Sequence, residues 1–372
     1  MNVSTHPGTA CGYPDLPQPL KHGAGARVAG TVYAGLGSAG SAWFGLSLAA
    51  PSPTWVARAP FPGTPREQAV AVASAGAVYV FGGLGVAADG RSQVLFDDIH
   101  RYDPVADAWE LLPVHAPVGL LGAAACALAD GRILFLGGAS KAVVEGFFAR
   151  LAEAGDDEAQ RLAVTRDYLG REPKAYGFHA EALCFDPVTQ RWQGLGRLPF
   201  APTLGAAVAR EGGCVALVQG ELKPGLRSRD AWQARVGATA LDWQPLPCPP
   251  AAGGAPEPEG LAGAFAGYVD GSLLVAGGTN FPGAWAQYRA GRRYAHEGLA
   301  KTWHGDVHAL VGGAWRRVGS LPWGLAHGLA FPVPQGLLLV GGERQGGAAS
   351  AAVQCLRWDG IAAHGCAQGD RP

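Results

Sequence analysis

The sequence has few charged residues and almost no excess of either sign. Asp, Glu, Lys and Arg make up 16% of the 372 residues, and the formal net charge is −1. Like charges do not form blocks, so nothing indicates a nucleic-acid partner or an anionic membrane surface. No apolar run approaches the ~20 residues that a membrane-spanning helix needs. We therefore predict neither a nucleic-acid partner nor a membrane span.

Cysteine is also scarce, and its spacing does not suit a framework of crosslinks. The seven cysteines are scattered along the chain, and none lies in a C-x-x-C pair. An odd count and irregular spacing argue against a set of disulfides. The same spacing argues against a structural zinc site. We predict no bound metal.

Glycine and tryptophan, by contrast, are plentiful and regularly placed. Six apolar runs each end in one or two of the 57 glycines, and a tryptophan follows every run. The runs end near positions 37, 83, 138, 220, 278 and 342, and the tryptophans are Trp55, Trp109, Trp192, Trp243, Trp315 and Trp358. A repeat of this length means that no single unit buries its own core, so the units must stack or close on each other.

The spacing within the repeat indicates a four-stranded unit. From a tryptophan to the next closing glycine, four of the five intervals are 27 to 29 residues long, whereas the intervals from glycine to tryptophan range from 16 to 54. The apolar runs are short and rich in Val, Leu and Ile, as buried strands are. Asp103-Pro104 and Asp186-Pro187 predict tight turns before two of the tryptophans. These features are typical of kelch repeats, which form β-propellers, whereas a β-sandwich rarely repeats such spacing.

We therefore predict an all-β fold, a six-bladed kelch-type β-propeller that is a single domain over residues 1–372. The blades are expected at about 21–62, 66–113, 118–199, 203–247, 260–322 and 325–372. Helical spacing over 141–176 predicts a helical insertion of two short helices in the third blade. Residues 279–303 predict a long loop insertion in the fifth. Which terminus supplies the last outer strand, and whether the protein forms a homodimer, stay open.

Both insertions are candidates for the walls of a binding pocket. In a propeller blade every second loop lies on the same face, so the segments after the glycines and after the tryptophans share one face. Loops on a rigid scaffold commonly carry binding groups. The alternative is that the insertions only cover apolar surface.

Polar residues gather in three clusters on that expected face. The clusters are Arg66, Glu67 and Gln68; Glu221 and Arg227; and Asn280 with His296. A carboxylate at Glu221 can take a proton from a bound hydroxyl, and Arg227 can hold a carboxylate in a bidentate fork. The alternative for Glu221 is a simple ion pair with Lys223 or Arg227 on a solvated loop.

Seven segments resemble the N-acetylneuraminate epimerases, kelch proteins that act as sialic acid mutarotases. The segments are PREQA, LFDDIHRYDPVADAW, APVGLLG, GELKPGLR, GLAGAFAG, GGTNFPG and YAHEGLAKTW, and the similarity runs from about Pro14 to Trp358. The resemblance implies a six-bladed propeller that converts α-N-acetylneuraminate to the β anomer. It also implies that Glu221 is the proton acceptor and Arg227 the essential cation beside it.

Sialic acid mutarotation fits these residues. A base must remove the proton of the anomeric hydroxyl, and the ring oxygen must gain a proton as the ring opens. No metal or redox cofactor is required. Glu221 is the predicted base; the acid is His296, Arg66 acting through water, or Glu221 itself. Arg66 and Arg227 are predicted to bind the sugar carboxylate, and Gln68 and Asn280 its hydroxyls or N-acetyl group, with Glu67 beside them.

Two other classes of protein share the kelch architecture. A kelch ring can be a non-catalytic module that binds protein partners through its loops. A copper-radical oxidase would need tyrosine, histidine and a thioether-forming cysteine at the axis, a set that this sequence lacks. The N-terminus has no basic start followed by an apolar stretch, which predicts a cytoplasmic location. Members of the resembling family usually work in the periplasm, which is the alternative.

Overall fold

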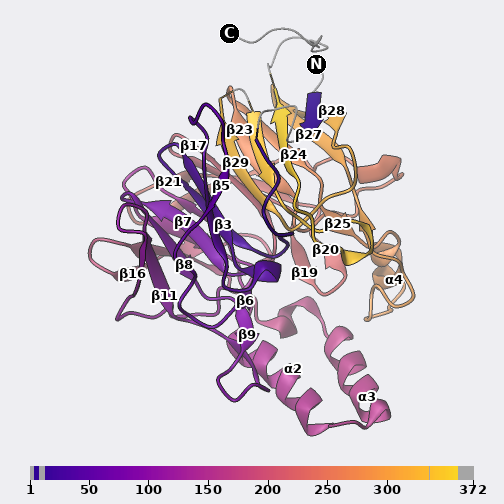
Figure 1. The fold of residues 1–372 in the computed structure, drawn as a ribbon. Coiled ribbons are helices and arrows are strands. Elements are labelled where there is room, and N and C mark those ends of the chain that lie inside the picture. The colour runs from indigo at the N-terminus through magenta and orange to yellow at the C-terminus, as the bar shows by residue number, and fades with distance from the viewer. Residues whose placement is uncertain (1–3, 8–12, 335, 359–372) are drawn as a thin grey trace.

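The computed structural model describes residues 4–7, 13–334 and 336–358, and these residues are mostly β-strand (Figure 1). Among them, six antiparallel sheets have four strands each. The first three sheets are β2 (Ala24–Val28), β3 (Thr31–Gly35), β4 (Trp43–Ser47) and β5 (Trp55–Ala57); β7 (Val70–Ser74), β8 (Ala77–Phe81), β11 (Ile99–Asp103) and β12 (Ala108–Leu111); and β13 (Ala124–Ala127), β14 (Ile133–Leu136), β15 (Glu181–Asp186) and β16 (Arg191–Arg197). In all three, the glycine-ended run of the repeat forms the second strand.

The remaining three sheets follow the same order. They are β17 (Ala207–Glu211), β18 (Cys214–Val218), β21 (Ala231–Val236) and β22 (Leu241–Leu246); β23 (Phe265–Val269), β24 (Ser272–Ala276), β27 (Asp306–Val311) and β28 (Ala314–Ser320); and β29 (Leu329–Val333), β30 (Gly336–Val340), β31 (Val353–Arg357) and β1 (Ser4–Pro7). The first strands β2, β7, β13, β17, β23 and β29 contact each other in turn, and β29 also contacts β2. The six sheets therefore form a closed ring.

The apolar core lies between the sheets and not within any one of them. Six clusters of buried side chains each join two neighbouring sheets. The cluster that closes the ring joins Val32 and Ala34 of the first sheet to Leu338 and Val340 of the last. This arrangement confirms the expectation that single units cannot bury their own cores.

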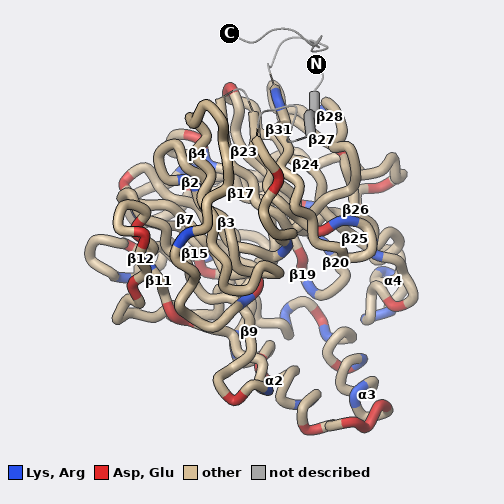
Figure 2. The backbone as a smooth tube through the Cα atoms, viewed as in Figure 1, with Lys and Arg blue, Asp and Glu red and all other residues tan. Residues whose placement is uncertain are grey.

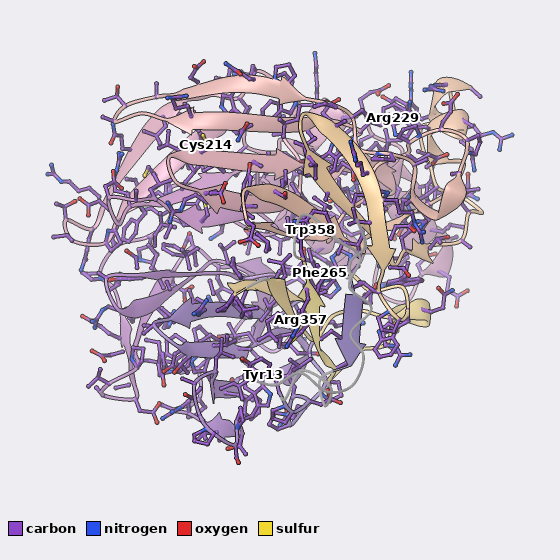
Figure 3. The ribbon with its side chains drawn as sticks, turned by 90° about the horizontal axis from the view of Figure 1, so that it is seen from above. Tyr13, Cys214, Arg229, Phe265, Arg357 and Trp358 are labelled. Atoms are coloured by element: carbon purple, nitrogen blue, oxygen red, sulfur yellow. The ribbon has the colours of Figure 1, made fainter. Side chains whose placement is uncertain are left out.

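The N-terminal segment takes the outer place in the last sheet. β1 pairs antiparallel with β31, with Ser4 opposite Arg357. Trp358 directly follows β31, so it does not lie in a fourth strand as five of the repeat tryptophans do. Its side chain is 1% exposed and belongs to the same apolar cluster as Phe265 (Figure 3). The expected C-terminal part of this blade, residues 359–372, lies outside the described residues.

Two tryptophans in the outer strands link neighbouring sheets through their indole nitrogens. Trp109 Nε1 donates to the Ala59 carbonyl oxygen at 2.8 Å, and Trp315 Nε1 donates to that of Pro247 at 2.8 Å. Each acceptor lies just after the outer strand of the preceding sheet. Tryptophan suits these two positions because a large apolar ring with one N–H donor can both pack and anchor a connection.

The long insertion of the third unit holds two helices, α2 (Lys141–Glu153) and α3 (Glu158–Leu169), followed by the 3-10 turn η2 (Pro173–Tyr176). Asp157 caps α3 by accepting a hydrogen bond from the Gln160 amide at 3.0 Å. The helices project from one end of the ring (Figure 1), and charged residues of both signs lie along α3 (Figure 2). No helix of the described residues is long and apolar enough to span a membrane.

Residues 279–303 are not simply a long loop, contrary to expectation. They begin with β25 (Thr279–Asn280), form the short helix α4 (Ala284–Arg289) and end in β26 (Thr302–Trp303), which pairs with β25. Two alanines and a glutamine favour the helix locally, and Ala284 packs into an apolar cluster with Leu226 and Ala295. Five shorter strands complete this end of the ring: β6 (Arg66–Glu67), β9 (Leu84–Val86), β10 (Gln93–Leu95), and the hairpin of β19 (Glu221–Lys223) and β20 (Leu226–Arg227).

Candidate functional site

A closed ring of backbone hydrogen bonds surrounds the axis where the six sheets meet. One residue from each unit contributes, always two positions before the first strand of its sheet. Each amide donates to the carbonyl oxygen of the preceding member, over 2.8 to 3.4 Å. The members are His22, Gln68, Gly122, Gly205, Gly263 and His327, and all six have positive φ angles. The ring ties every sheet to its two neighbours at the axis.

Three members of this axial ring are not glycines. His22, Gln68 and His327 have φ of 52°, 53° and 54°, a conformation that costs a side-chain-bearing residue roughly 1–2 kcal/mol. Their side chains help to line an axial cavity of about 190 Å³. Strain of this kind persists where the surrounding structure enforces it, and it is frequent at functional sites. The axial mouth is therefore a candidate binding site.

Glu221 and Arg227 face each other across a short hairpin beside this ring. Glu221 begins β19 (Glu221–Lys223) and lies opposite Arg227 of β20 (Leu226–Arg227). The Glu221 amide donates to the Leu204 carbonyl oxygen at 2.7 Å, which places the hairpin next to the ring member Gly205. The preceding Gly220 has φ of +97°, and a Cβ there would come within 2.8 Å of the Thr203 hydroxyl. Glycine is therefore required just before the carboxylate.

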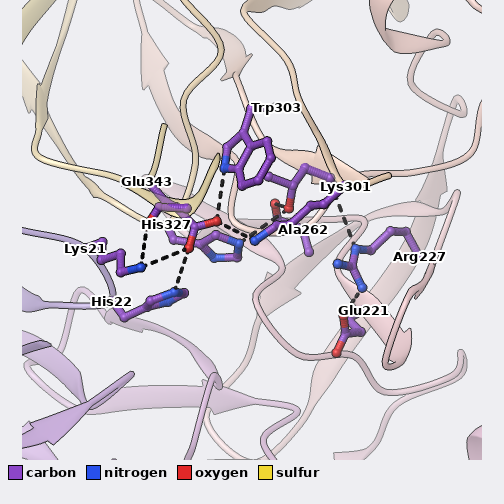
Figure 4. Close-up of polar contacts among 11 residues, drawn as sticks. Lys21, His22, Glu221, Arg227, Ala262, Lys301, Trp303, His327 and Glu343 are labelled. Carbon is purple, nitrogen blue, oxygen red and sulfur yellow. Dashed lines mark hydrogen bonds and ion pairs between the residues drawn. The ribbon is translucent and has the colours of Figure 1, made fainter. Parts of the chain in front are cut away.

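The two side chains form an ion pair in close contact (Figure 4). The Arg227 side chain is 5% exposed, whereas that of Glu221 is 22% exposed. Arg227 Nε also donates to the Thr279 carbonyl oxygen at 3.4 Å. Burial lowers the pKa of Arg227 to about 9, which leaves the guanidinium charged at neutral pH. The pair is thus not on a solvated loop: the cation is buried and the carboxylate keeps access to solvent.

Lys223 does not pair with Glu221, although the sequence allowed it. Its side chain is fully buried, and Nζ donates to the carbonyl oxygens of Arg293, at 2.5 Å, and Arg171. Burial lowers its pKa to about 8. Since Arg171 follows α3 and Arg293 follows α4, this lysine joins the hairpin to both insertions.

The two insertions also contact each other directly. Arg293 Nε lies 2.6 Å from Glu172 Oε1, and Tyr288 donates its hydroxyl to Glu172 Oε2 at 2.5 Å. Arg166 Nη2 lies 3.0 Å from Glu297 Oε1. The insertions and the hairpin therefore make up one wall beside the Glu221–Arg227 pair.

Two predicted site residues of the fifth unit lie near that pair. Phe281 packs against His296 with tilted rings whose centroids are 4.6 Å apart, and the Arg227 guanidinium lies 5.7 Å from the Phe281 centroid. Burial and the charge of Arg227 lower the pKa of His296 to about 4, so the imidazole is neutral at pH 7. Asn280 is buried, donates to the Gly260 carbonyl oxygen at 3.2 Å and lies 2.8 Å from His304 Nε2. Both ends of its amide are engaged by the protein.

The PREQA cluster does not join this group as a unit. Arg66 is buried between the rings of Phe61 and Phe96, and it forms a two-pronged ion pair with Asp98. Its Nε also donates to the Thr64 carbonyl oxygen at 3.0 Å. Arg66 would have to leave Asp98 to bind a substrate carboxylate. Glu67 is exposed on β6, whereas Gln68 is a member of the axial ring.

A second acidic residue, Glu343, was missed although it holds the same place in the last unit as Glu221 does in the fourth. Its amide donates to the Ala326 carbonyl oxygen, next to the ring member His327. Its carboxylate accepts from Trp303 Nε1 at 3.0 Å and from Lys301, and it lies 3.3 Å from His22 Nε2 and 3.7 Å from Lys21 Nζ. The hydrogen bonds from His22 and Lys301, with the charge of Lys301, outweigh burial and hold the pKa of Glu343 far below its usual range. A glutamate directly after the closing glycine, as at 221, was the available signal.

His327 lies between the two acidic positions (Figure 4). Its ring centroid is 4.7 Å from that of His22, and its Nε2 is 3.4 Å from the Thr279 hydroxyl. Burial is the main reason that its pKa falls to about 3, and the nearby cations, among them Lys301 and Arg227, add to the effect. Thr279 and His327 thus connect the Glu221–Arg227 pair to the group around Glu343.

Comparisons with known proteins agree on one family. The family model described as N-acetylneuraminate epimerase matches residues 13–364. A protein of Yersinia pestis (strain Pestoides F) with that name is 44% identical over 353 residues, which cover 95% of this chain and 90% of the relative. A Haemophilus influenzae (strain PittEE) protein with the same name is 41% identical, covering 94% and 92%. A solved structure described as "Structure of YjhT" has a TM-score of 0.87 at 38% identity, covering 91% of this chain and 95% of that one.

Proposed function

The chain belongs to the N-acetylneuraminate epimerase family, and we propose that it interconverts the α and β anomers of N-acetylneuraminate beside the axial ring. The family match confirms the resemblance drawn from the seven sequence segments. The substrate is thus a monoanionic sugar acid, and the reaction is the opening and closing of its ring.

One observation carries the proposal: a partly exposed carboxylate is held by a buried cation at the end of a ring of sheets. Arg227 fixes the orientation of Glu221 and stabilises its charge, while the exposed part of the carboxylate can meet a ligand. The hairpin pairing holds Glu221 opposite Arg227, and the missing side chain at Gly220 lets the turn before Glu221 pack closely against Thr203. A base must be in reach of the proton it removes, so this defined placement favours a catalytic role over a simple surface ion pair.

Glu221 takes the proton from the anomeric hydroxyl, and the bond between the anomeric carbon and the ring oxygen breaks to leave a ketone. The ring oxygen receives a proton as it leaves. The carbonyl then turns its other face to that hydroxyl, and the reverse steps close the ring as the other anomer. No atom is gained or lost, and each proton removed is returned.

Glu221 is also the group that we propose to protonate the ring oxygen. The hydroxyl oxygen and the ring oxygen are bonded to the same carbon, so a single carboxylate can reach both in turn. The other two candidates have less support. Low basicity leaves His296 without a proton to give at neutral pH, and Arg66 is engaged by Asp98.

The finer architecture belongs to the same proposal. We infer that the ring is a six-bladed kelch propeller and that residues 1–372 are one domain. Its first five blades then lie at about 21–62, 66–113, 118–199, 203–247 and 260–322, with the insertions in the third and fifth. The sixth begins at about 325 and takes β1 as its outer strand. Gln68, at the axial ring, and Asn280, beside the hairpin, remain the proposed contacts for the hydroxyls or N-acetyl group, and the homodimer remains a prediction.

The test is anomer exchange of N-acetylneuraminate followed by NMR. Glu221→Gln should slow catalysed exchange by about 10²–10⁴-fold, the usual worth of a general base, and leave the folded spectrum intact. Glu211→Gln, an exposed change at the far end of β17 in the same sheet, is the matched control and should exchange normally. Undiminished exchange in Glu221→Gln would remove the carboxylate from its role. A wild type that exchanges nothing would favour a protein-binding module instead.

A further inference from the structure

The cations expected to bind the sugar carboxylate are both already neutralised by a carboxylate of the protein. Asp98 engages Arg66, and Glu221 engages Arg227. Their guanidinium side chains are 1% and 5% exposed. Neither pair has positive charge to spare for a monoanionic ligand.

The group around Glu343 differs in its charge balance. Two ammonium groups, those of Lys21 and Lys301, share this one carboxylate. The lysine side chains are 27% and 28% exposed, whereas that of Glu343 is 6% exposed. The group therefore has one positive charge in surplus, and that charge lies on its more exposed members.

The position of this group ties it to the same site. Lys301 directly precedes β26, which pairs with the strand that carries Thr279 and Asn280. The Thr279 carbonyl oxygen accepts from Arg227, and its hydroxyl lies within 3.4 Å of His327. His22, beside Glu343, lines the axial cavity together with His327. Figure 4 shows Lys301 extending toward Glu343 from the side of the Glu221–Arg227 pair.

We propose that Lys21 and Lys301, held by Glu343, form the subsite for the carboxylate of the sugar acid. This inference rests on the proposed function and deepens it, because it assigns to the two lysines the contact expected of Arg66 and Arg227. Glu343 is the anchor of the subsite and not a proton carrier. Its carboxylate accepts from Lys301 and Trp303, lies 3.3 Å from His22 Nε2 and forms a longer ion pair with Lys21, whose Nζ also donates to the Gly347 carbonyl oxygen. It is therefore a weak base that helps to position the two lysine head groups.

The chemistry of the ligand fits this arrangement. A carboxylate has two oxygens that accept charge-assisted hydrogen bonds, and each ammonium group has donors to spare after it meets Glu343. The His22 and His327 rings, which both line the axial cavity, would provide flat walls beside this subsite. Arg227 then remains free to orient Glu221 throughout the reaction.

The test compares two substrates that differ by one charge: N-acetylneuraminate and its methyl ester at the carboxylate. Lys301→Met and Lys21→Met should each raise KM for the acid about tenfold or more, as expected for loss of a charged hydrogen bond. KM for the ester should change little in either variant. Lys301→Arg, which keeps the charge, should restore most of the affinity for the acid. Lys141→Met, at the ion-paired start of α2, is the control and should leave both substrates unchanged.

Equal effects on acid and ester, or no effect on either, would overturn the subsite while wild-type exchange upholds the proposed function. An acid-selective loss in Arg227→Lys but not in the lysine variants would place the carboxylate at Arg227. If the wild type exchanges neither substrate, the proposed function fails, and calorimetric binding of the acid still decides the subsite: affinity that depends on Lys21 and Lys301 supports it, and any other result rejects it. Circular dichroism of each variant identifies those that fail to fold. If one lysine variant does not fold, the other one decides whether the subsite exists.

Discussion

Glu221 and Glu343 hold the same place in two units of the ring, and their surroundings differ. Glu221 has one buried arginine as its partner and a side chain that is 22% exposed. Glu343 is surrounded by two lysines, a histidine and a tryptophan, and its side chain is 6% exposed. The repeat supplies the position after the closing glycine, and the neighbouring loops decide what the carboxylate there can do. In our proposal, Glu221 exchanges a proton with the substrate, whereas Glu343 is a fixed counter-ion.

Removing the charge should therefore reduce mainly the stability of the protein at position 343 and mainly its activity at position 221. Glu343→Gln leaves two lysines short of a counter-ion in a largely buried place, and we expect it to lower the free energy of unfolding by about 3–5 kcal/mol. Glu221→Gln should cost less stability, because the amide oxygen can still accept from the single partner Arg227, but it should cost most of the activity. Denaturant unfolding of both variants measures the contrast. Equal losses of stability would contradict it.

The axial ring gives a second contrast, because His327 links it to the Glu343 group. Gly205 and Gly263 both have positive φ, and a Cβ at 205 finds no atom within 3.6 Å. A Cβ at 263 would lie 2.3 Å from His327 Nδ1. Gly205→Ala should cost about 1 kcal/mol for the backbone alone, and Gly263→Ala a further 1–3 kcal/mol for overpacking. If denaturant unfolding shows the same cost for both, His327 is not held where we describe it.

Lowering the pH should reduce the free energy of unfolding, because His327, beside the Glu343 group, is held unprotonated in the folded protein. Its folded pKa, about 3, lies below the unfolded value of 6.5, so the unfolded chain binds more protons between these values and stability falls as the pH falls through that range. From pH 7 to pH 5 we expect a loss of about 1–2 kcal/mol from this group. The lowered pKa of Glu343 adds a further loss below about pH 4.5. His327→Gln should show a shallower pH dependence than the wild type, and the exposed His115→Gln should not.

Much of the architecture could be predicted from the sequence because the repeat is encoded locally. Glycines end the second strands, and tryptophans lie in five of the six outer strands, so the pattern recurs along the sequence. Glu221 could be singled out because a charge after a closing glycine is unusual. The axial ring had a comparable signal, a Gly, His or Gln followed by Gly or Ala two residues before each first strand, which was not used.

The partners of the site residues could not be predicted, because they come from distant parts of the chain. Asp98 is 32 residues from Arg66, and the atoms that bind Lys223 are 52 and 70 residues away. The sequence shows an arginine near a predicted pocket, but it does not show that the arginine already forms an ion pair with another residue. The arrangement of charged side chains around Glu343 likewise depends on residues from three units that meet at the axis.

Lys223 joins the hairpin that carries Glu221 to the two insertions. Its substitution tests whether substrate binding needs that connection, and we expect the smallest effect here. Lys223→Met keeps the length and apolar stem of the side chain but loses both hydrogen bonds to carbonyl oxygens. Burying a lysine is costly, so its loss should change stability little. The insertions should become less firmly attached to the hairpin, and KM for N-acetylneuraminate should rise about three- to tenfold while Glu221 stays in place. Lys174→Met, an exposed change in the insertion of the third unit, is the control. If Lys223→Met instead lowers kcat as strongly as Glu221→Gln with KM unchanged, the lysine acts on the reacting groups and not on the wall.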